Sequence, residues 1–92
     1  MNIATQHVAA TQFLRSLLSA GARVDGFTEL SERLAVSSDW RSCLASSLER
    51  ASALRIRVRA DRDCSEAIGT LLAGFGFKDH RKARLLELIV GR

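Results

Sequence analysis

Apolar and charged residues alternate along residues 54–60, whereas apolar residues recur at helical spacing in the segments around them. The apolar members of this stretch are Leu54, Ile56, Val58 and Ala60, and the charged members are Arg55, Arg57 and Arg59. A period of two predicts a β-strand with one buried face. A strand without a neighbour leaves its backbone N–H and C=O groups unpaired, so the fold must supply a second strand. The need for that second strand is the strongest constraint on the architecture.

Residues 84–90 are the predicted partner strand within the chain. Their apolar residues suit either a short helix or a buried strand. We favour the strand because residues 54–60 need a partner. Between the two, residues 64–74 carry apolar residues at helical spacing, and Asp63 with Glu66 resembles a capping box that opens this helix. The pattern predicts a strand-helix-strand unit with a right-handed parallel crossover.

A helical conformation of residues 84–90 is the alternative, and it changes the expected architecture. The strand at residues 54–60 would then pair with a strand of another molecule. The protein would be mainly α, and it would form a homodimer or present a sheet edge that captures a peptide.

The spacing of apolar residues in the N-terminal half predicts three helices, over residues 3–20, 29–36 and 40–53. Glycine, serine and aspartate residues separate them and supply caps and turns. The chain has 92 residues, of which 47% are apolar, and this is enough for one modest core. We therefore predict a single small α+β domain over residues 1–92, with three N-terminal helices followed by the strand-helix-strand unit.

The sequence lacks the residues that several classes of protein need for their function. No run of about 18 apolar residues is present to span a membrane, and the N-terminus lacks a secretory signal, so we expect a cytoplasmic protein. Cys43 and Cys64 are far apart and neither lies near His7 or His80, so no zinc-ligand spacing occurs. No nucleophile, base and orienting group form a recognisable set. We expect a non-enzymatic protein with no cofactor and no bound metal.

Positive charge is concentrated in the second half of the chain. The first 49 residues contain four arginines and five acidic residues, whereas the remainder contains ten arginines and lysines and five acidic residues. Alternation places Arg55, Arg57 and Arg59 on one face of the predicted strand, about 7 Å apart. Guanidinium groups at this spacing suit carboxylates or phosphates. The alternative is a solvated face in which one arginine pairs with Glu87 across the sheet.

We predict that the protein is a regulator or adaptor that binds an acidic surface of another protein. The candidate contact residues are the arginines in and around the predicted strand, with an aromatic residue and its basic neighbour at the start of the third helix. They are Arg50, Arg55, Arg57, Arg59, Arg62, Trp40 and Arg41. Trp40 has two interpretations, because tryptophan is commonly a core residue at a helix start and is also enriched among the residues that dominate interfaces.

A second function is indicated by residues 29–48, which resemble a helix-turn-helix. Apolar or small residues occupy the positions where the motif needs them, namely Leu30, Leu34, Ala35, Val36 and Leu44. The resemblance implies a transcriptional regulator that binds nucleic acid, with the Trp40 helix in the groove and the arginines on phosphates. The sequence departs from the motif at Arg41, where the second helix normally buries a branched apolar residue.

Overall fold

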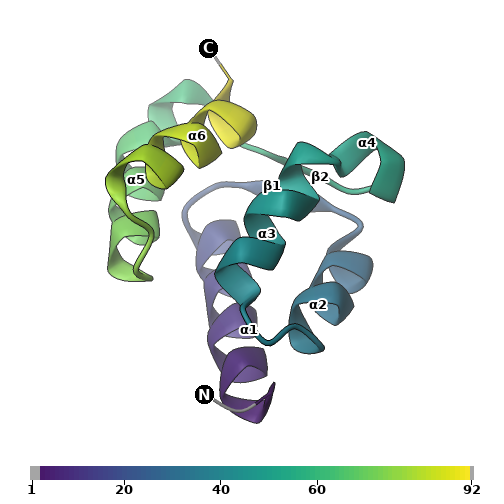
Figure 1. The fold of residues 1–92 in the computed structure, drawn as a ribbon. Coiled ribbons are helices and arrows are strands. Elements are labelled where there is room, and N and C mark those ends of the chain that lie inside the picture. The colour runs from purple at the N-terminus through teal and green to yellow at the C-terminus, as the bar shows by residue number, and fades with distance from the viewer. Residues whose placement is uncertain (1–2, 92) are drawn as a thin grey trace.

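The computed structural model describes residues 3–91, and these form a helix-rich fold with one small sheet (Figure 1). The helices are α1 (Ile3–Ser19), α2 (Phe27–Ala35), α3 (Trp40–Glu49), α4 (Ala51–Leu54), α5 (Ser65–Gly74) and α6 (Asp79–Val90), with a 3-10 turn η1 (Arg62–Cys64). The strands are β1 (Arg23–Asp25) and β2 (Arg57–Arg59). The predicted α+β class is compatible with this helix-rich architecture, whereas the predicted number and order of the elements are not confirmed.

Apolar residues recur every three or four positions along α1 and give it one buried side. Phe13, Leu14 and Leu17 are fully buried on that side. The helix ends at Ser19, and Gly21 follows with a φ of 100°. A side chain at Gly21 would also lie 2.8 Å from Cys64 Sγ, so the turn after α1 requires glycine for both reasons.

α2 and α3 lie where two of the helices are predicted, with different bounds. The Asp39 carboxylate caps α3 by accepting hydrogen bonds from the Ser42 backbone N–H at 3.3 Å and the Ser42 hydroxyl at 2.8 Å. The helix predicted over residues 40–53 is interrupted at Arg50, so that α3 ends at Glu49 and α4 follows as a separate turn. A strand, β1, also lies between α1 and α2, and the predicted order of elements has no strand at this place.

The sheet corrects the predicted topology. β2 is shorter than the predicted strand, because Leu54 belongs to α4 and Arg55 has a left-handed backbone with a φ of 58°. Its partner is β1, which runs antiparallel to it. The register pairs Arg23 with Arg59, Val24 with Val58 and Asp25 with Arg57. Since β2 finds its neighbour within the chain, the predicted reason for sharing a sheet between two molecules no longer applies.

Residues 84–90 are helical and belong to α6, so the predicted parallel strand-helix-strand unit is wrong. Leu85 and Ile89 lie one helical turn apart and both are buried. This spacing lets a helix dock one side on the core. A helix also satisfies its own backbone hydrogen bonds, so α6 needs no neighbouring strand.

An aromatic cluster lies at the centre of the core. The ring centroid of Phe13 is 5.2 Å from those of Trp40 and Phe75 and 5.6 Å from that of Phe77. The rings of Trp40 and Phe77 meet edge to face at 88°, a geometry that the aromatic quadrupole favours. The cluster joins α1, α3 and the segment between α5 and α6.

α6 connects the helical core to the sheet. It packs against α5, α3 and β2, and Figure 1 shows it beside α3 and above β2. The Ala60 N–H donates a hydrogen bond to the Ile89 carbonyl at 3.0 Å, which ties the chain just after β2 to the C-terminal half of α6. The edge of β2 that faces away from β1 therefore lies next to the end of α6.

Candidate functional site

The outward face of the sheet carries three arginines. Arg57 and Arg59 are exposed, whereas Val58 between them is buried. Arg23 lies directly opposite Arg59 in the antiparallel register, and directly opposed residues point to the same face. We call Arg23, Arg57 and Arg59 the arginine surface. Arg23 belongs to it only through the pairing of β1 with β2, which the sequence pattern does not reveal.

The arginine surface is incompletely neutralised by the protein itself. Arg23 lies 3.6 Å from Asp61, and both side chains are largely exposed. Arg57 and Arg59 form no ion pair with any residue in the described part of the chain. Arg23 and Arg59 are like charges directly opposite each other, which is unfavourable in a sheet, whereas Asp25 lies opposite Arg57 and balances part of its charge. Three arginines face this one strand acid and the exposed Asp61. The surface is therefore well suited to receive negative charge from outside the molecule.

An open groove of about 380 Å³ borders the arginine surface. The three arginines line its sheet side. The remaining lining is mostly apolar and comes from β2 and the ends of α3, α4 and α6: Leu48, Ala51, Val58, Ala60, Leu88, Ile89, Val90 and Gly91. The groove thus combines a cationic rim with an apolar wall.

The backbone of β2 also faces this groove. The Ala60 N–H points away from β1, because it donates to Ile89 on the other side. Peptide groups two residues apart in an extended chain share one edge, so the N–H and C=O of Val58 face the same way. Val58 lines the groove. An extended segment lying in the groove would therefore run beside the backbone of Val58.

The other predicted arginines lie around this region without lining the groove. Arg50 follows α3, Arg55 follows α4, and Arg62 begins η1. All three are exposed and form no ion pair with a described residue. The alternation that would align Arg55 with Arg57 is broken, because Arg55 precedes the strand in a left-handed conformation. Glu87 pairs with Arg84 at 3.1 Å rather than with a strand arginine.

Trp40 and Arg41 do not belong to the arginine surface. Trp40 has 0% exposure and packs in the aromatic cluster, so its interpretation as a contact residue for a partner is corrected to that of a core residue. The Arg41 guanidinium carbon lies 4.9 Å from the centroid of the Trp40 ring, and its Nε donates to the Phe75 carbonyl. Arg41 stands at the start of α3 and Arg50 just after its end, about 14 Å apart along the helix axis.

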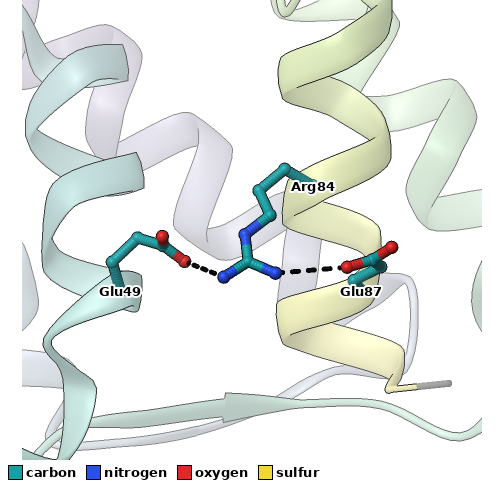
Figure 2. Close-up of polar contacts among 3 residues, drawn as sticks. All are labelled: Glu49, Arg84 and Glu87. Carbon is teal, nitrogen blue, oxygen red and sulfur yellow. Dashed lines mark hydrogen bonds and ion pairs between the residues drawn. The ribbon is translucent and has the colours of Figure 1, made fainter.

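α2 and α3 form the predicted pair of helices with a short turn between them, but α6 stands beside α3. Arg84 forms an ion pair with Glu49 at 2.7 Å, and Arg81 donates to the Ser42 hydroxyl at 3.4 Å. Figure 2 shows Arg84 bridging Glu49 of α3 and Glu87 of α6. The side of α3 that carries Ser42 and Glu49 is therefore engaged by another helix and offers no row of free cations.

The described residues provide no constellation for metal binding. Within residues 3–91, no group of three or more His, Cys, Asp or Glu side chains converges, and Cys43 and Cys64 are both unpaired thiols. In the same part of the chain, no helix has the length and apolar character that crossing a bilayer requires.

The site must therefore be interpreted from its own chemistry: exposed guanidinium groups, an apolar wall and a strand edge. No relative supplies a residue role or an activity that could be carried over to it. Comparison of the chain with protein-family models, with curated proteins and with solved structures finds no match.

Proposed function

We propose that this protein is a non-enzymatic regulator or adaptor that binds an acidic segment of another protein in the groove beside the arginine surface. The observation that carries the proposal is the exposed pair Arg57 and Arg59, which forms no ion pair with a described residue, although Asp25 lies opposite Arg57, and which borders a groove with an apolar wall. A charged rim around an apolar contact area is the usual arrangement of a protein-binding surface.

The spacing of the arginines indicates the conformation of the bound segment. Arg57 and Arg59 are two residues apart on one face of a strand, which separates them by about 7 Å. An extended peptide presents alternate side chains at the same interval, so carboxylates two residues apart can each receive a guanidinium fork. The backbone of that peptide would pair with Val58 at the edge of β2, next to the point where Ala60 is hydrogen-bonded to α6, in the manner of strand addition.

Nucleic acid is the second candidate partner, because the same arginines suit phosphates and because α2 and α3 form a helix pair with a short turn. Two observations make it the weaker candidate. The face of α3 with Ser42 and Glu49 is engaged by α6. Phe13, Trp40 and Phe77 are buried, so these rings offer no platform for stacking bases.

The proposal is tested by affinity capture from a lysate of the source organism, divided into nuclease-treated and untreated halves. The native protein is compared with Arg57→Glu/Arg59→Glu and with the control Arg15→Glu/Lys82→Glu, which changes net charge equally at positions away from the groove. We expect a stoichiometric protein that survives nuclease, binds the native and control proteins, and is lost with the variant. The bound protein is then identified by mass spectrometry, and its acidic segment is synthesised for measurement of Kd.

Two outcomes would contradict the proposal. If the arginine variant retains the same protein as the native chain, the arginine surface is only solvated. If nuclease removes everything that is bound, the nucleic-acid function takes first place. Circular dichroism of each variant verifies that the helices are intact.

A further inference from the structure

A second hollow, of about 330 Å³, lies at the opposite end of α3 from the groove. It is formed where the start of α3 meets the loop between α5 and α6 and the first turn of α6. Its lining residues are Asp39, Arg41, Gly76, Phe77, Lys78, His80 and Arg81. Basic side chains therefore outnumber the single acid. We call Arg41, Lys78, His80 and Arg81, with the space between them, the basic hollow.

The Arg41 guanidinium is held in a defined orientation at this hollow. Its Nε donates to the Phe75 carbonyl, and its plane is placed near the Trp40 ring. It also lies across Gly76, where a side-chain carbon would be 3.2 Å from Arg41 Nε. The two terminal nitrogens of Arg41 have no hydrogen bond or ion pair to any described residue. A fixed guanidinium with free terminal donors loses little side-chain entropy when an anion binds.

The other two permanent cations of the hollow, Lys78 and Arg81, form no ion pair with a described residue. Arg81 makes a long hydrogen bond of 3.4 Å to the Ser42 hydroxyl and also acts electrostatically on the nearby Asp39 carboxylate. The one acid, Asp39, accepts two hydrogen bonds from Ser42 as the cap of α3. The Asp39 charge is thus shared between the start of α3 and Arg81, and the three permanent cations of the hollow exceed the one acid by two charges.

We propose that the basic hollow binds a phosphate monoester through Arg41, Lys78 and Arg81. This inference is independent of the proposed function, because it concerns different residues at the other end of α3. A phosphate monoester carries nearly two negative charges and three acceptor oxygens, which matches three cations that come from two separate elements. A single carboxylate, with one charge and two oxygens, would leave part of this set unused. The hollow is also open, so the group esterified to the phosphate can extend into solvent.

The test is an NMR titration of the full chain, labelled with ¹⁵N, at constant ionic strength. O-phosphoserine and adenosine monophosphate are the probes, and serine and adenosine are their controls without phosphate. We expect saturable shifts in the amides of Arg41 and residues 76–81 with both phosphate esters and with neither control. A response to only one ester also supports the proposal and identifies the source of the phosphate. A response to neither, or equal responses to ester and control, overturns it.

A pair of matched variants separates a specific site from general attraction to a basic protein. Lys78→Gln/Arg81→Gln removes two charges from the hollow, and Arg15→Gln/Lys82→Gln removes two charges elsewhere. We expect the first variant to weaken phosphate-ester binding roughly fivefold or more, because a single exposed charge pair contributes up to about fivefold in affinity. The second variant should leave phosphate-ester binding unchanged. Equal weakening by both variants would show that the ester responds only to net charge and would refute the site.

Discussion

Arg84 of α6 forms an ion pair with Glu49 of α3, with 2.7 Å between nitrogen and oxygen (Figure 2). A second nitrogen of the same guanidinium lies 3.1 Å from Glu87, so one side chain joins α3 to α6 and also spans one turn of α6. The hydrogen bond with Glu49 is the main cause that raises the pKa of Arg84. About half of each side chain is exposed, so water and salt screen the interaction.

We expect the ion pair between Arg84 and Glu49 to contribute little to the free energy of unfolding. Glu49→Gln removes the charge and keeps a side chain of similar shape, and we expect the urea midpoint to stay within experimental error of the native value, because exposed pairs contribute little. Raising the salt concentration should then affect the native protein and the variant alike. A clear loss of stability in Glu49→Gln that high salt abolishes would show that the pair contributes more than its exposure suggests.

Burial of apolar side chains is expected to hold α6 in place. Leu85 is fully buried, and Leu85→Ala removes its contacts and leaves a cavity, so the free energy of unfolding should fall by about 2–5 kcal/mol. Leu86→Ala, at a partly buried neighbouring position on the same helix, is the control and should cost less. Urea denaturation followed by circular dichroism measures both. Equal losses in the two variants would contradict the assignment of Leu85 to the core side of α6.

The contrast between α6 and the sheet explains how much of the fold could be predicted. Residues 54–60 show alternation, and this correctly indicates a strand, although only Arg57–Arg59 forms it. Its partner, β1, covers only Arg23–Asp25, which is too short for any period to be visible. Because no pattern marks β1, residues 84–90 are the remaining candidate for the partner strand in the sequence. The spacing of Leu85 and Ile89 fits a helix equally well, and only tertiary packing decides between the two.

The candidate sites likewise combine residues whose exposure follows from the local sequence with residues that are brought in by long-range contacts. Exposure of Arg57 and Arg59 follows from alternation, which is a local property of the sequence. The contribution of Arg23 depends on the register of β1 against β2, and that of Lys78 to the basic hollow depends on the packing of α6 beside α3. Long-range contacts of this kind leave no local pattern. Helical spacing around Trp40 is compatible with either core or surface, and its burial beside Phe13 is decided by α1.

The cap of α3 predicts a specific dependence of stability on pH. The side-chain hydrogen bond from Ser42, followed by its backbone hydrogen bond, lowers the pKa of Asp39 below the ordinary value of 3.8. A carboxyl with a lowered pKa in the folded state contributes stability that is present above its unfolded pKa and is lost as pH falls through its folded pKa. The native protein should therefore lose this contribution under strongly acidic conditions.

Asp39→Asn isolates the effect, because asparagine also caps helices but does not titrate. We expect the difference in unfolding free energy between the native protein and Asp39→Asn to be constant above about pH 5. Below about pH 4 the native protein should become less stable relative to Asp39→Asn. Urea titrations of both proteins at a series of pH values measure this difference. A difference that stays constant down to the lowest pH would mean that the Asp39 carboxylate is not favoured by the fold.

Two glycines that flank Phe75 provide the sharpest comparison of backbone effects. Gly74 ends α5 with nothing within 4 Å of the position that a side-chain carbon would take, whereas Gly76 has a φ of 91° and such a carbon would lie 3.2 Å from Arg41 Nε. Gly74→Ala should stabilise the protein by up to about 1 kcal/mol, because alanine restricts the unfolded chain and suits a helix. Gly76→Ala should destabilise it by about 1–2 kcal/mol through backbone strain alone.

The same pair of variants links the fold to the basic hollow. Because the Arg41 guanidinium lies across Gly76, the added methyl group of Gly76→Ala must displace it, whereas Gly74→Ala leaves it in place. Phosphate-ester binding should therefore weaken in Gly76→Ala and stay native in Gly74→Ala, as measured by the same NMR titration on protein that remains folded. Native binding by a folded Gly76→Ala protein would mean that the orientation of Arg41 has no part in holding the ligand, and the hollow would then act only through the cations of α6 and its preceding loop.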